Sequence, residues 1–190
     1  MSSFNPMNPL GQLALFLLGT AACIAGMTRT ADAQNATTGE VKAAFIYNFA
    51  RFTEWPIAAF SSPSSPFLIG VTGDELMRQT VEAVVKGKAV GGRQLRTRPV
   101  KDEKDLGDIQ MLFVGESSNS RVGELVKALK GQPVLTVGAV DRFCDRGGMI
   151  NFLLEDNRVR FEIRVDATEQ AGLKVSSRVL TLARTIHGKS

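Results

Sequence analysis

Apolar side chains recur at helical spacing near the start of the chain. Val41 is followed three and four residues later by Ala44 and Phe45, and Phe49 and Phe52 continue the pattern at steps of four and three. This spacing predicts a helix with one buried face. Thr37 or Thr38 can cap its start, and Thr37 with Glu40 fits a capping box. We expect Pro56 to end the helix, because the residue before a proline disfavours helical geometry.

Short apolar runs then alternate with helix-like segments. The predicted buried strands are residues 67–72, 109–114 and 134–137, and residues 94–100 alternate enough to form another strand. The predicted helices are residues 74–85, with Asp74 at the start, and residues 118–129. Apolar strands that alternate with helices are typical of a mostly parallel sheet covered on both faces.

The last third of the chain changes character. Residues 149–154 and 159–165 flank a turn-forming segment, residues 155–158, which predicts a β-hairpin. In the second strand Val159, Phe161, Ile163 and Val165 point to one face, and Arg158, Arg160, Glu162 and Arg164 point to the other. The second face is therefore exposed to water or meets a polar partner. A short helix over residues 166–172 and an amphipathic helix over residues 176–186 are expected to follow.

These elements predict the fold class. We expect an α/β single-domain sandwich with a mostly parallel central sheet, helices on both faces and a C-terminal β-hairpin. We see no internal repeat and no second domain in the sequence.

The N-terminus resembles an export signal. Residues 10–27 carry no charge, and the small residues Ala31 and Ala33 flank a site that a signal peptidase could cut. We expect residues 1–33 to be a cleaved signal peptide and residues 34–190 to be the mature domain. The first basic residue, Arg29, follows the apolar run instead of preceding it. A transmembrane anchor and lipidation at Cys23 are the alternatives.

Composition restricts the chemistry of the mature chain. The formal net charge of +4 is scattered, which gives no basic run of the kind that binds nucleic acid. Removal of the signal leaves one cysteine, Cys144, and one histidine, His187, which lies near a C-terminus expected to fray. A Cys144–His187 dyad is a weaker interpretation than structural roles for both residues. No zinc-ligand cluster, phosphate loop or dinucleotide motif occurs, so we predict no catalytic residue, metal or cofactor.

Two other functions remain open. A hydrolase could use a carboxylate pair drawn from Glu116, Asp141, Asp145 and Glu162. A small-molecule binding protein could use the carboxyl ends of the parallel strands, at residues 72–74 and 115–117.

Several motifs resemble those of the YfiR/HmsC-like family. They are EVKAAFIYNFARFTEWP at residues 40–56, RFCDRGGMI at 142–150, VRFEI at 159–163 and GLKVSS at 172–177. Their order and spacing cover essentially the whole mature chain. The resemblance implies a periplasmic repressor, without enzymatic activity, that binds the periplasmic sensor domain of an inner-membrane diguanylate cyclase. It further implies lower cyclic di-GMP and less biofilm, sequestration by an outer-membrane lipoprotein, and a homodimer.

We expect the cyclase to contact the hairpin and the short helix after it. The predicted partner-binding residues there are Ile150, Glu162 and Thr168. The alternative for Glu162 is that it only balances the charges of its arginine neighbours. Members of the family often pair the cysteine before Gly-Gly-Met with another a few residues later, whereas Cys144 has no such partner near Asn151. The resemblance therefore leaves redox control through that bridge in doubt.

Overall fold

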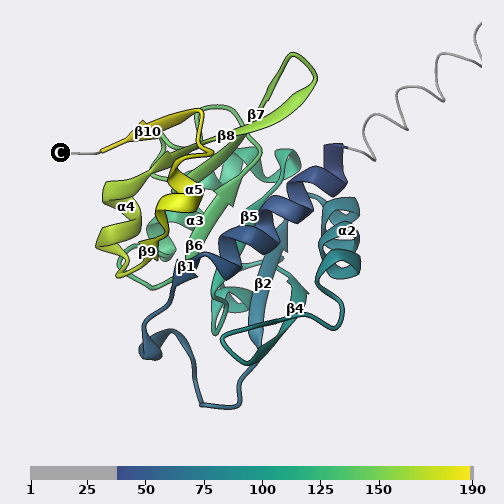
Figure 1. Ribbon diagram of the computed structural model, residues 1–190, viewed down its shortest axis with the longest axis vertical. Coiled ribbons are helices and arrows are strands. Elements are labelled where there is room, and N and C mark those ends of the chain that lie inside the picture. Colours follow the sequence, from purple (N-terminus) through teal and green to yellow (C-terminus); the bar gives the residue numbers. More distant parts are fainter. Residues whose placement is uncertain (1–37, 189–190) are drawn as a thin grey trace, which may run out of the picture. The chain divides into compact units, whose positions relative to one another are not determined.

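A mixed sheet of eight strands organises residues 38–188, which are the residues described by the computed structural model (Figure 1). The strand order is β10-β8-β7-β6-β5-β2-β4-β3. The predicted signal peptide and Thr37 lie outside the described residues, so cleavage after residue 33 stays a prediction. No helix within residues 38–188 is long and apolar enough to cross a bilayer.

Parallel pairing joins the centre of the sheet. The parallel strands are β4 (Arg93–Pro99), β2 (Phe67–Thr72), β5 (Met111–Val114), β6 (Leu135–Gly138) and β7 (Ile150–Glu155). The strand β8 (Arg158–Arg164) pairs antiparallel with β7, and β10 (Thr185–His187) pairs parallel with β8. At the other edge β3 (Ala89–Val90) pairs antiparallel with β4. A separate two-stranded sheet joins β1 (Thr53–Glu54) to β9 (Lys174–Val175).

Helices cover both faces of the sheet, which confirms the predicted α/β fold with its C-terminal hairpin. The first helix spans residues 38–51. The others are α2 (Glu75–Val85), α3 (Val122–Ala128), α4 (Val165–Gln170) and α5 (Ser177–Leu180). In Figure 1 the first helix crosses one face of the sheet beside α2, while α3 lies behind the sheet. As predicted, Asp74 caps α2: its carboxylate accepts a hydrogen bond from the Met77 amide at 2.8 Å.

Each face has its own apolar core, because alternate strand residues point to opposite sides. On one side the first helix and α2 pack on residues such as Val137, Phe152 and Phe161. On the other side α3 packs on Leu112 and Val114. Burial of the sheet on both faces accounts for the continuous apolar runs in the sequence.

The ring of Phe143 fixes the loop that leads from β6 into β7. This side chain is fully buried in the second core. The ring lies against Gly138 and Gly148, where an added Cβ atom would overlap its carbons. The Gly147-Gly148 pair thus does more than turn the chain, because Gly148 also gives the ring its space.

Three predicted helix boundaries were wrong. The first helix ends at residue 51, well before Pro56, because Thr53–Glu54 pairs with β9 and the Phe52 carbonyl accepts from the Ser176 amide at 2.9 Å. The segment 118–129 begins with a 3-10 turn, Glu116–Arg121, before α3. Within that turn Ser118 is buried against Thr72 and does not cap a helix.

The third wrong boundary concerns the last predicted helix, residues 176–186. It is only α5, four residues long, and the chain then forms β10. The Arg184 amide donates to the Phe161 carbonyl at 2.7 Å, so this segment pairs with backbone groups of β8 that would otherwise lie at the edge of the sheet. Its apolar residues reach the same core as a helix would have done, since Val179 is buried and Ile186 packs against that core. Tertiary pairing therefore overrides the helical periodicity.

The Gly148→Ala variant tests the packing of Phe143. We expect it to lower the free energy of unfolding by about 1–3 kcal/mol, because the added methyl group forces the ring out of its site. Chemical denaturation measures the change. The matched control is Gly123→Ala in α3, where no atom lies within 4 Å of the added carbon. This control should be neutral or stabilising by up to about 1 kcal/mol, and equal stability of both variants would contradict the packing argument.

Candidate protein-binding site at the C-terminal hairpin

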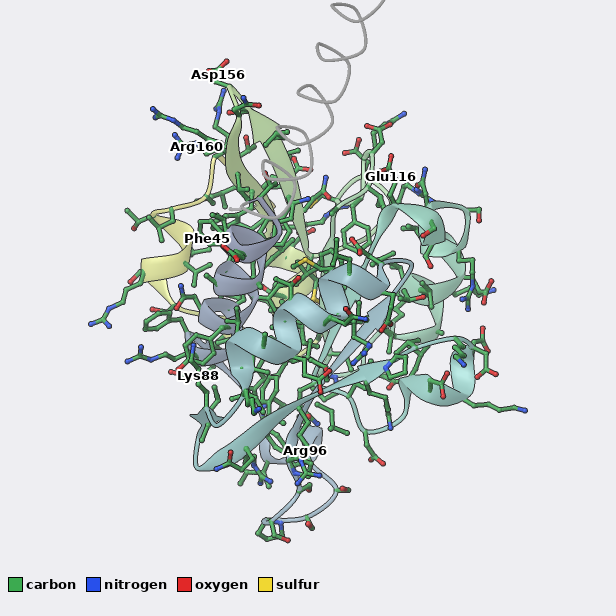
Figure 2. The ribbon with its side chains drawn as sticks, turned by 90° about the vertical axis from the view of Figure 1, so that its right-hand side faces the viewer. Phe45, Lys88, Arg96, Glu116, Asp156 and Arg160 are labelled. Atoms are coloured by element: carbon green, nitrogen blue, oxygen red, sulfur yellow. The ribbon has the colours of Figure 1, made fainter. Side chains whose placement is uncertain are left out.

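The β7–β8 hairpin closes with a tight two-residue turn. Asp156 and Asn157 have φ angles of 48° and 60°, the left-handed geometry that matches the twist of paired strands. Asn and Asp tolerate this geometry better than most residues, which explains why this segment forms the turn. Figure 2 shows Asp156 and Arg160 at the free end of the hairpin, away from the helices.

The outer half of the hairpin presents cations beside an apolar side chain. Arg158 and Arg160 are exposed, and the partly exposed Leu153 lies directly opposite Arg160 on the same face. Glu155 is engaged by Arg184, which follows α5, at 3.3 Å. Neither Arg158 nor Arg160 has an ion-pair partner within residues 38–188, so their charges are available to a partner protein. Arginine beside a partly exposed apolar residue is a composition typical of protein interfaces.

The inner half of the same face is a polar cluster around Glu162. One carboxylate oxygen accepts a hydrogen bond from the Asn151 amide at 3.3 Å, and the other lies 2.9 Å from His187 Nε2. The Glu162 side chain is only 18% exposed. Glu162 therefore does not simply balance its arginine neighbours, because its partners lie on β7 and β10.

Cys144 completes this cluster from the loop before β7. Its thiol is 2% exposed and donates to the Met149 carbonyl at 3.8 Å. Burial raises the pKa of the Cys144 thiol, and the nearby Glu162 carboxylate raises that pKa further, because both disfavour a thiolate. The arrangement therefore opposes nucleophilic chemistry at Cys144, although it brings the thiol near Glu162.

The three predicted partner residues occupy different environments. Ile150 is fully buried in the first core, and Thr168 is 1% exposed with its hydroxyl donating to the Val165 carbonyl at 2.7 Å. Of the three, Glu162 alone has solvent-accessible side-chain surface. The predicted contact with a partner stays a prediction for all three. For Ile150 and Thr168 the burial implies an effect through the packing of the hairpin and α4.

The strand ends considered for a small-molecule binding protein make several contacts within the chain. The Gly115 amide donates to the Thr72 carbonyl at 2.8 Å, and a Cβ atom at Gly115 would overlap Asp74. The Ser117 hydroxyl donates to the Gly73 carbonyl. These contacts engage the Gly115 amide and two carbonyls, and binding of a small molecule at these strand ends stays a prediction.

The carboxylates considered for hydrolysis are engaged separately. Asp145 pairs with Arg142 at 3.0 Å, whereas Glu162 pairs with His187. In residues 38–188 no three His, Cys, Asp or Glu side chains form a group able to hold a metal ion.

Sequence reasoning missed His187 and Asn151. The single histidine was expected in a frayed tail, but it lies in β10, opposite Arg164 in the register. Asn151 is 2% exposed, and its side-chain oxygen has no hydrogen-bond partner among the described residues. A polar residue within the otherwise apolar run of β7 was the available signal, since buried amides normally pair.

Thiol reactivity tests the environment of Cys144. We expect iodoacetamide at pH 8 to modify Cys144 about a hundredfold more slowly in the folded protein than in denaturant, because reaction requires local opening and a thiolate. Mass spectrometry of the Cys144 peptide measures the rate separately from Cys23.

The control for this experiment is Glu162→Gln, which removes the neighbouring negative charge. Its rate should rise yet stay far below that of the unfolded chain, because burial is the larger cause of the raised pKa. Equal rates in folded and unfolded wild-type protein would contradict the buried site.

A family model describes most of this chain. The YfiR/HmsC-like model matches residues 39–184, from the first helix almost to β10, and so includes the whole hairpin but not His187 of the polar cluster. This family consists of periplasmic regulators of diguanylate cyclases and is generally non-enzymatic. The match spans far more than half of the 190 residues, so the chain belongs to the YfiR/HmsC-like family.

Proposed function

We propose that this protein binds the periplasmic sensor domain of an inner-membrane diguanylate cyclase and holds the cyclase inactive. Membership of a family of such regulators is the observation that carries the proposal. Lower cyclic di-GMP and less biofilm would follow in the cell. Export by the predicted signal peptide would deliver the protein to the periplasm, and a homodimer and an outer-membrane lipoprotein that releases the cyclase belong to the same proposal.

The hairpin supports this proposal as the contact surface. Its outer half combines the unpaired cations Arg158 and Arg160 with the partly exposed Leu153 on one face. Its inner half is anchored by the first helix, since the rings of Phe49 and Phe161 lie 5.0 Å apart. A rigid surface loses little conformational entropy on binding, which favours affinity.

Repression requires a preference between states. A protein shifts a cyclase towards its inactive form only if it binds that form more tightly than the active one. A shift of the cyclase from 99% active to 99% inactive needs a preference of about 10⁴-fold. The proposed surface therefore has to fit the inactive sensor domain specifically, beyond a general attraction of charges.

Deletion of the gene tests the cellular role. We expect cellular cyclic di-GMP and biofilm to rise, and complementation with the wild-type gene to restore both. The purified protein should capture a diguanylate cyclase from solubilised membranes, as identified by mass spectrometry. Unchanged cyclic di-GMP together with no captured cyclase would count against the proposal.

Charge reversal locates the surface. Arg160→Glu should weaken capture of the cyclase about tenfold or more, which corresponds to ~1.4 kcal/mol. Glu162→Lys should also weaken capture, because it places a cation beside Arg164 and breaks the contacts with His187 and Asn151. Circular dichroism confirms that each variant is folded.

The matched control is Arg96→Glu on β4. Arg96 is exposed, and Figure 2 shows it far from Arg160, near the bottom of the view whereas Arg160 lies near the top. The net charge of this variant equals that of Arg160→Glu, so its capture should match the wild type. Equal losses in both arginine variants would indicate general electrostatic attraction and exclude a hairpin-specific contact.

A further inference from the structure

A groove lies between α3 and α4. Its volume is about 480 Å³, and Val126 of α3 and Leu129, which caps α3, contribute apolar lining. Ala167 of α4 and Ala171, which caps α4, also line it, together with Met149. Ligand pockets in proteins commonly measure about 300–1,000 Å³ and combine apolar walls with a few polar groups.

Cationic side chains outnumber carboxylates among the residues that line this groove. Four cationic side chains line it, and Asp166 is the only carboxylate among the lining residues. Arg164 pairs with Asp166 at 3.3 Å. Lys127 and Lys130 are exposed and have no ion-pair partner in the described chain.

Some other cations of the described chain are neutralised locally. Arg78 pairs with Glu75 at 2.7 Å and with Glu82 at 2.6 Å, and Arg121 pairs with Glu124 at 3.4 Å. The groove therefore differs from these surfaces, because its two lysines face a hollow that holds a single, already paired carboxylate.

The two arginines of the groove are held in place. Both terminal nitrogens of Arg146 donate to Asn119, at 2.6 and 2.7 Å. Arg164 donates from Nη1 to the Cys144 carbonyl at 2.8 Å, and its Nη2 group makes no hydrogen bond within residues 38–188. Fixed guanidinium groups beside mobile lysines provide directional donors and long-range attraction for an anion.

We propose that this groove binds a small organic anion with at least two negative charges, supplied by two or more carboxylates or by a phosphate ester. Lys127, Lys130 and Arg164 bind the anionic groups, while Leu129 and Ala167 contact the carbon skeleton. The site is distinct from the strand ends at Gly73 and Gly115. The inference is independent of the proposed regulation of a cyclase, since it concerns binding to this chain alone.

Calorimetric titration of the purified protein tests the groove. Citrate serves as the polycarboxylate probe and glycerol 3-phosphate as the phosphate ester, with acetate as the monovalent comparison, all at constant ionic strength. We expect saturable binding of citrate or glycerol 3-phosphate and none of acetate; the better of the two probes identifies the anionic group. The double variant Lys127→Gln/Lys130→Gln should weaken that binding at least tenfold.

The control double variant is Lys86→Gln/Lys104→Gln. These lysines are exposed, lie outside the groove and leave the same net charge when replaced. This control should bind the probes like the wild type. Absence of saturable binding to citrate and glycerol 3-phosphate, or equal weakening in both double variants, would overturn the site. Neither result would affect the proposed capture of a cyclase, because no cyclase is present in the titration.

Discussion

Contact between four phenylalanine rings holds the C-terminal hairpin on the first helix. Phe45 and Phe49 from the helix meet Phe152 and Phe161 from the two hairpin strands, with ring centroids 5.0–6.1 Å apart across the two elements. Such pairs contribute about 0.5–1.5 kcal/mol each beyond the burial of their area. The cluster joins segments more than one hundred residues apart in the sequence, so it fixes the direction in which the hairpin leaves the sheet.

The hairpin is consequently different on its two faces. The face with Phe161 and Ile163 is committed to the core, whereas the face with Arg160 and Glu162 is free to carry polar chemistry. Strict alternation along β8 produces this division, and a slip of one residue in the β7–β8 register would exchange the faces. The packing of the aromatic rings thus specifies which side chains a partner can reach.

The sequence alone predicted the elements whose patterns are local. Three local patterns each identified their element: the apolar run at residues 67–72, the cap at Asp74 and the alternation along residues 159–165. Burial on one or two faces of an element gives its apolar residues a regular spacing in the sequence. The pattern at residues 176–186 misled, since Val179 and Ile186 reach the core in a short helix followed by a strand. No local signal shows that β8 has a free edge, so β10 and the place of His187 required the tertiary structure.

The candidate site was predictable only at the level of the segment. The alternation identified the polar face of the hairpin, but Ile150 and Thr168 lie beneath the surface, and sequence position alone does not report that burial. The pairing of Asn151 with Glu162 depends on the strand register. The groove between α3 and α4 combines residues from distant segments, so the sequence contains no run of basic residues that would reveal its positive charge.

Glu162 combines two properties that a regulatory contact needs. Its carboxylate is largely removed from water, and its neighbour His187 offers a full charge only when protonated. The adjacent Asn151 side-chain oxygen is buried and has no hydrogen-bond donor within residues 38–188. Desolvation of these groups is thus mostly complete before a partner arrives, so a donor from the partner would gain a hydrogen bond at little further cost. An exposed arginine such as Arg160 provides attraction at longer range, whereas the fixed Glu162 carboxylate favours a partner with a donor in one position. A contact of the second kind gives more specificity for one state of a sensor domain, because a conformational change that displaces the donor loses the hydrogen bond to Glu162.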